Sequence, residues 1–217
     1  MKTLFKIFAV IILVSLTTNA QGKLSLGFNG GLASPSGDFG DIYKSGFGGN
    51  AVLSFTLTDN ILLSGSVGYY TMDFDNDKLS EMTEGSGIDV SVDAPISIIP
   101  VMVGGKYLLT NGKFKPYVTA ELGIHSMSID EAAVTISGER FVFKESASET
   151  KMAWAIGAGA YINLSEKIDL EISAKYNGNG SEASTSSTTT NGGTVTTESS
   201  SSTLTFLTLL AGINIAL

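Results

Sequence analysis

An acidic run in the middle of the sequence has the spacing of a calcium-binding loop. Asp73, Asp75 and Asp77 alternate along the chain, and Glu84 follows seven residues later. Acids with this spacing supply the carboxylate ligands of EF-hand-type loops. Such a loop needs a glycine where this chain has Lys78, and no flanking helices are expected. Two interpretations therefore stay open, a loose calcium site and a solvated acidic loop.

The single histidine, His125, is the second residue that could do chemistry. Ser126 and Ser128 follow it, and an imidazole beside a hydroxyl is part of a nucleophilic hydrolase site. Catalysis requires these side chains to converge, but neighbouring residues of a strand point to opposite faces. We therefore expect a polar histidine at a barrel mouth and a protein that is not an enzyme. A lone histidine also excludes histidine-rich metal sites, so no cofactor other than calcium is expected.

The first residues have the features of a targeting segment. Lys2 and Lys6 form a positive stretch before an apolar run at 7–16, which fits a signal peptide and is too short for a membrane helix. Cleavage is expected after Ala20. Residues 1–20 are then the signal peptide, and residues 21–217 form one mature domain.

Charge and cysteine content exclude several classes of protein. The chain has 13 basic and 21 acidic residues, and loss of two lysines with the signal takes the formal net charge from −8 to −10. This balance argues against nucleic acid as a partner, because nucleic-acid binding needs a basic surface. Without cysteine the chain has neither disulfides nor a cysteine for lipid anchoring. Its apolar residues lie in short runs, as in β-proteins embedded in lipid.

Eight segments alternate in polarity, each long enough for the ~9–11 residues of a tilted membrane-spanning strand. The predicted strands are 23–33, 46–57, 61–72, 95–109, 114–129, 151–164, 168–176 and 204–217. The connections after the second, fourth and sixth strands are short, whereas the others are long. This pattern predicts an all-β fold, an eight-stranded antiparallel up-and-down transmembrane β-barrel with short periplasmic turns and long extracellular loops. The last long loop is rich in Ser and Thr and is expected to be disordered.

The composition of the two strand faces decides which face is outside. One face is apolar, whereas the other carries small residues such as Gly48, Ser64, Ala155 and Gly157. Small side chains suit the crowded interior of an eight-stranded barrel, so the apolar face is expected to contact lipid. A soluble barrel with the opposite arrangement is the alternative.

Four charged residues fall on the face of small residues and are expected inside the barrel. They are Lys106, Glu121, Glu171 and Lys175. Buried charges need partners, which predicts a structural ion-pair network. Lys115 and Asp169 are candidates to extend this network. For these two residues and for Lys175, a position in water at a barrel mouth is the alternative. A lumen filled in this way leaves no room for an open pore.

Several stretches of the sequence carry a family resemblance. They are NAQ at the end of the signal, LSLGFNGGLASPSGDFGDIYKSGFGGNAVLSFTLTDNILLSGSVGYY, IPVMVGGKYLLTNGKFKPYVTAELGI and AWAIGAGAYINLSEKIDLEISAKY. Together they resemble the small outer-membrane β-barrel domain family of opacity proteins, OmpX and the OmpA transmembrane domain, in the style of Bacteroidota. The resemblance implies the cell outer membrane, contact with its lipid and insertion by the barrel assembly machinery. It supplies no catalytic residues. One departure is the terminal Leu217, where such barrels often end in an aromatic residue.

The sequence therefore favours an integral outer-membrane barrel with a structural or surface-interaction role in adhesion or the envelope. Its outside loops would meet an extracellular ligand or surface partner. The alternatives are a narrow channel or transporter for small or apolar solutes and a soluble secreted lipocalin-like carrier.

Overall fold

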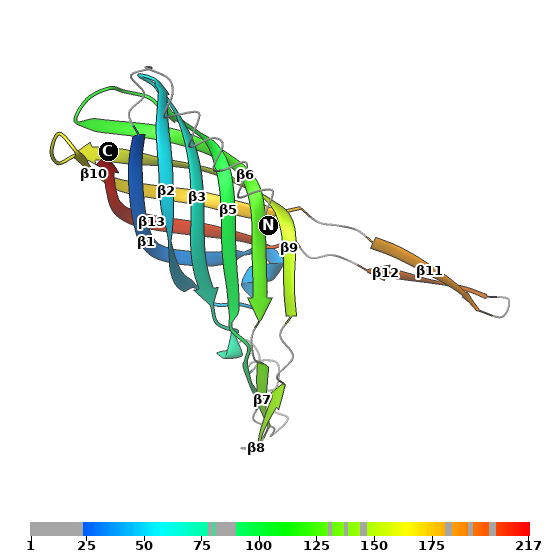
Figure 1. Cartoon of the computed structure of the whole chain (residues 1–217). Coiled ribbons are helices and arrows are strands. Elements are labelled where there is room, and N and C mark those ends of the chain that lie inside the picture. The colour runs from blue at the N-terminus through cyan, green and yellow to red at the C-terminus, as the bar shows by residue number, and fades with distance from the viewer. Residues whose placement is uncertain are drawn as a thin grey trace.

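A closed antiparallel barrel is the main body of the computed structural model, which describes residues 24–77, 80, 90–129, 132–136, 139–143, 147–180, 184–190, 193–199 and 203–217. Within these residues, eight strands close the barrel (Figure 1). They are β1 (Leu24–Ser36), β2 (Gly46–Thr58), β3 (Ile61–Met72), β5 (Ile96–Leu108), β6 (Phe114–Ile129), β9 (Ala147–Asn163), β10 (Ile168–Asn179) and β13 (Thr205–Ala216). The first and last strands pair with each other, with Leu26 opposite Ile215. The predicted fold class is confirmed.

The outside of the barrel is apolar on every strand. Exposed apolar side chains, taken from the eight strands in turn, are Phe28, Phe47, Val67, Val103, Leu122, Ile156, Ile172 and Ile213. On β10, Ile172 is 49% exposed, while its neighbours Glu171 and Ser173 are 2% and 5% exposed. An apolar outer surface around buried charged and polar side chains is the reverse of a soluble barrel. The predicted orientation of the two faces is confirmed.

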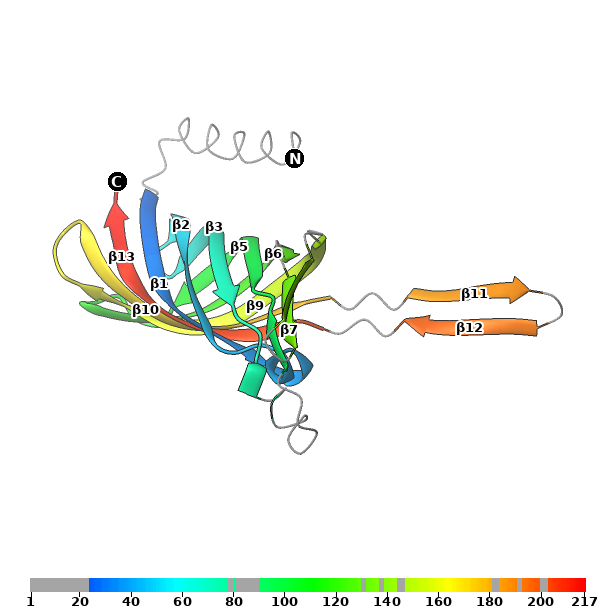
Figure 2. The ribbon, with the colours of Figure 1, turned by 90° about the horizontal axis from the view of Figure 1, so that it is seen from below.

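Short turns lie at the end of the barrel where β1 begins and β13 ends (Figure 2). In the turn between β2 and β3, Thr58 Oγ1 accepts the backbone N–H of Ile61 at 3.1 Å. Asn60 Nδ2 donates to the carbonyl of Leu108 at 2.9 Å, which ties this turn to the neighbouring one. Asn and Thr are suited to these turns because their side chains form hydrogen bonds with backbone groups that have no partner in a strand.

The long connections carry structure of their own. A short 3-10 helix, η1 (Gly37–Asp41), follows β1, and β4 (Val90–Asp93), β7 (Ala132–Ile136) and β8 (Glu139–Phe143) form a three-stranded sheet. No helix in the described part of the chain combines the length and the apolar character needed to cross a membrane.

The Ser/Thr-rich loop differs from the predicted disorder. β11 (Ser184–Thr190) and β12 (Gly193–Ser199) pair as an antiparallel hairpin that projects away from the barrel (Figure 1). Threonine is β-branched and favours extended backbone. The sequence between the strands is Asn191-Gly192, the dipeptide typical of tight hairpins. Composition predicted disorder, but local strand propensity and turn chemistry favour the pairing.

Candidate functional site

An apolar plug fills the lumen at the end that carries the long loops. It consists of Ala33, Phe39, Tyr70, Met72, Ile96, Ile98, Met127, Leu204, Phe206 and Leu210. Phe39 comes from η1, which therefore contributes a side chain to the closure, and Ile98 and Phe206 are fully buried. An eight-stranded barrel is narrow enough for side chains to fill it.

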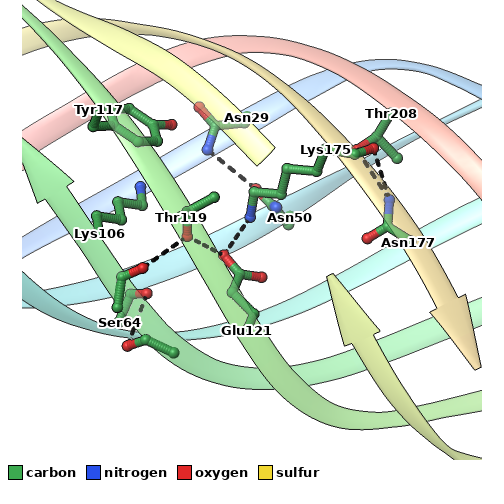
Figure 3. Close-up of polar contacts among 12 residues, drawn as sticks. Asn29, Asn50, Ser64, Lys106, Tyr117, Thr119, Glu121, Lys175, Asn177 and Thr208 are labelled. Carbon is green, nitrogen blue, oxygen red and sulfur yellow. Dashed lines mark hydrogen bonds and ion pairs between the residues drawn. The ribbon is translucent and has the colours of Figure 1, made fainter. Parts of the chain in front are cut away.

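Two buried ion pairs lie inside the barrel. Lys106 Nζ is 2.7 Å from Glu171 Oε1, and Lys175 Nζ is 2.6 Å from Glu121 Oε1. All four residues are 5% exposed or less. Figure 3 shows the Lys175–Glu121 pair. The structure thus brings together the four charged residues singled out in the sequence, and joins β10 to both β5 and β6.

Neutral side chains complete the shell around Glu171. Its carboxylate accepts hydrogen bonds from the hydroxyl of Tyr117 and, at 3.2 Å, from Asn29 Nδ2. Lys106 Nζ donates to the Tyr161 hydroxyl at 2.6 Å and lies 4.8 Å and 5.0 Å from the ring centroids of Tyr117 and Tyr161. A buried ion pair is tolerated only when further hydrogen bonds satisfy its remaining donors and acceptors. The sequence did not identify the two tyrosines as members of the network, although each occupies an inward-pointing position in the alternation of its strand.

Two glycines provide space for the charged side chains. Gly104 lies opposite Glu121 in the ladder, and Gly157 lies opposite Lys175. A Cβ atom on Gly104 would lie 2.7 Å from the Glu121 Cα, and one on Gly157 would lie 2.9 Å from the Lys175 Cα. Both distances are too short for real Cβ contacts. Glycine at these two positions is therefore required by the packing around the network.

Lys115 and Asp169 pair at the end with the short turns, outside the fully buried network. Lys115 Nζ is 3.3 Å from Asp169 Oδ2, and the side chains are 27% and 18% exposed. They line a hollow of about 1260 Å³ that also reaches Tyr161 and Asn163. This pair therefore lies in a wet mouth, which is one of the two positions expected from the sequence.

The acidic run after β3 is neutralised in part by a lysine. Lys44 Nζ lies 2.6 Å from Asp77 Oδ2 and 3.6 Å from Asp75 Oδ1. The hydrogen bond from Lys44 to Asp77 raises the pKa of the lysine. Glu84 lies outside the described residues, and among those described no group of three His, Asp or Glu side chains is arranged to hold a metal. Calcium binding through Asp73, Asp75, Asp77 and Glu84 stays a prediction, which calcium titration by calorimetry would check.

His125 is deeply buried, so its predicted position at a barrel mouth is wrong. It is 0% exposed, its ring lies 5.7 Å from that of Phe206, and neither ring nitrogen has a hydrogen-bond partner among the described residues. Alternation gives the face of a residue but not its depth in the barrel, which explains the error. Ser126 instead receives an exposed hydrogen bond from Thr150. The described residues therefore provide no convergent hydroxyl for this imidazole.

Comparison with known proteins agrees with this architecture. A model of the outer membrane protein beta-barrel domain family matches residues 7–215. The structure of Neisserial surface protein A is similar, with a TM-score of 0.50 and 16% identity over 89% of this chain and 97% of that chain. A major outer membrane protein from Thermus thermophilus gives a TM-score of 0.58 and 12% identity over 90% of this chain and 99% of that chain. At such identities the likeness concerns the fold alone. No curated protein matches the sequence.

Proposed function

Because this chain belongs to the outer membrane protein beta-barrel domain family and lies in the outer membrane, we propose that it is a non-conducting, non-catalytic barrel. In this proposal the barrel is a membrane anchor, and the long loops are an interaction surface for a partner outside the cell.

The observation that carries the proposal is the filled lumen. The hollow at the turn end reaches Tyr161, which already contacts the buried Lys106. At the loop end, the apolar plug, in which Phe206 is fully buried, occupies the lumen. A solute would have to displace both paired charges and close-packed apolar side chains. This supports an anchor over a channel.

The loops supply the surface for the second half of the proposal. On the small sheet, Phe141 and Val142 are 49% and 43% exposed, next to an ion pair of Arg140 with Asp93 at 3.3 Å. Apolar side chains exposed beside charges are typical of contact surfaces. The β11–β12 hairpin extends this end of the molecule further outward (Figure 2).

Processing and insertion belong to the same proposal. Residues 1–20 would be removed as a signal peptide, and the barrel assembly machinery would insert the mature chain. N-terminal sequencing of the protein from outer-membrane fractions checks the first point. A first residue of Gln21 is expected, and Met1 at the N-terminus would contradict it.

The main proposal is tested by electrical recording and a surface assay. The mature protein, folded as judged by heat-modifiable migration on a gel, is expected to give no stable single-channel currents in planar bilayers. On whole cells, adhesion to a host-cell monolayer is expected to fall when 184–199 is replaced by a Gly-Ser segment of equal length. The control replaces the turn at 110–113, on the opposite side of the membrane, by a Gly-Ser segment of the same length as that turn. Persistent currents would overturn the anchor, and equal adhesion by both variants would show that this hairpin is not the contact surface.

A further inference from the structure

A small crevice opens at the loop end of the barrel, on the outer side of the apolar plug. Its volume is about 200 Å³, and its walls come from η1 and from the loop ends of β5, β6, β9 and β10. Residues just before β13 also line the crevice, so six segments that are distant in sequence meet around it. This volume is below the ~300–1,000 Å³ of sites for drug-sized ligands, so it suits a ligand of about one ring and a short side chain.

The floor of the crevice is apolar and aromatic. Phe39 and Met127 are each 8% exposed and belong to the plug. The ring of Tyr43 packs 4.9 Å from that of Phe39 and also makes an edge-on contact with Phe74 at 6.1 Å. Aromatic faces attract organic cations, most strongly where water is partly excluded.

The rim of the crevice carries net negative charge. Asp38 is exposed and has no hydrogen bond or ion pair among the described residues. Glu149 pairs with Lys151 at 3.2 Å, which leaves the Asp38 carboxylate as the uncompensated charge of the rim. A cation bound between Asp38 and the aromatic floor would be stabilised both by the carboxylate charge and by the aromatic rings.

One buried donor faces this crevice without a good acceptor. Asn179 is 2% exposed, and its Oδ1 accepts the backbone N–H of Leu204 at 2.8 Å. Its Nδ2 donates only to Met127 Sδ, at 3.6 Å, and a thioether is a weak acceptor. A ligand oxygen would satisfy the amide better than sulfur does.

From the crevice, its aromatic floor, its free carboxylate and the underused amide, we propose a binding site for a small organic monocation. The ligand is a compact aromatic or alicyclic ammonium ion that also carries one hydrogen-bond acceptor. This site is independent of any macromolecular partner of the loops, so either proposal can fail alone.

Three probes with the same frame test the charge preference. They are phenylethanolamine as the cation, phenylethylene glycol as its neutral analogue and mandelate as the anion. Backbone amide shifts of the mature protein in lipid nanodiscs are titrated at low salt. Saturable shifts at η1 are expected for the cation, with about ten-fold weaker binding of the glycol and weaker binding still of mandelate. Equal affinity for the cation and the glycol, or no saturable shift with the cation, would overturn the proposal.

Matched variants test the residues. Asp38→Asn is expected to weaken phenylethanolamine binding about five- to ten-fold, while Asp59→Asn in the turn at the other end leaves it unchanged. Tyr43→Leu keeps an apolar floor but removes a ring face, and is expected to weaken the cation more than the glycol. Heat-modifiable migration verifies that each variant is folded. Unchanged cation affinity in Asp38→Asn would refute the site.

Discussion

Replacing Glu171 by leucine is the most informative single change in the lumen. Glu171 is 2% exposed and accepts from Lys106 at 2.7 Å and from Asn29 at 3.2 Å, as well as from Tyr117. Leucine is close in volume but accepts nothing. Among the described residues, the buried Lys106 ammonium would then keep the Tyr161 hydroxyl and the two tyrosine rings as partners, but no carboxylate.

The expected loss is large because an unpaired charge is left in the interior. Removing one member of a buried ion pair costs about 3–5 kcal/mol. For a chain of this size each kcal/mol shifts the unfolding temperature by roughly 2–4 °C. The apparent unfolding temperature of Glu171→Leu should therefore fall by about 6–20 °C. Changing both partners, in Lys106→Met with Glu171→Leu, removes the orphaned charge and should restore most of the loss.

The measurement is the temperature at which the heat-modifiable band of the folded barrel is lost in detergent, at one fixed heating rate. Glu166→Leu is the control, since this carboxylate is exposed in the turn before β10 and its loss should change stability by less than about 0.5 kcal/mol. If Glu171→Leu unfolds at the wild-type temperature, the cost assigned to leaving the Lys106 ammonium unpaired is refuted. A double variant no more stable than Glu171→Leu would show that the loss comes from packing and not from the unpaired lysine.

Three further changes test other parts of the barrel. Ile172→Lys puts a charge on the lipid-facing surface and should cost about 2–4 kcal/mol if the residue lies near the bilayer centre. The measurement is the loss of the folded band on a gel after folding into vesicles. Folding at the wild-type level would contradict a lipid-facing position. Gly157→Val forces a side chain against the backbone of Lys175 and should destabilise the barrel by about 1–3 kcal/mol, whereas Gly112→Ala, with open space around it, should unfold at the wild-type temperature. His125→Leu removes two buried nitrogens that have no partner among the described residues, and should raise the unfolding temperature by a few degrees. A lower temperature would mean that the imidazole has a partner such as bound water.

The barrel could be predicted from the sequence because lipid imposes one rule on every strand. Outward residues must be apolar, so the period of two is visible even where a strand has few charges. Strand ends at the loop side were less predictable. β1 continues to Ser36 and β10 to Asn179, three residues past the predicted ends. Beyond the membrane the apolar rule no longer applies, but backbone pairing continues, as between Ser36 and Thr205.

The four charged members of the network could be named from the sequence, but neither the tyrosines that complete it nor the pairing of the charges could. Alternation assigns Lys106 to the inner face, and the ladder places it beside Thr119 of β6. Its ion pair is with Glu171 of β10, across the lumen. Such contacts depend on the stagger of the strands and on the height of each residue along the barrel axis, which alternation does not determine. The same limit hid the depth of His125.

The order of the layers along the lumen separates the two ends of the protein. The wet mouth with Lys115 and Asp169 stops at the tyrosine shell around Lys106, and the outer crevice stops at the apolar plug. Between them lie two ion pairs with equal numbers of positive and negative charges, so the layer has no net charge to attract a permeant ion. Apolar side chains of similar volume could fill this space with comparable stability. We therefore expect the ion pairs to matter most for geometry, because they connect β10 to β5 and β6 across the lumen. Binding at the loop end should accordingly leave the turn end unchanged, as expected for an anchor that presents a surface and not for a gated channel.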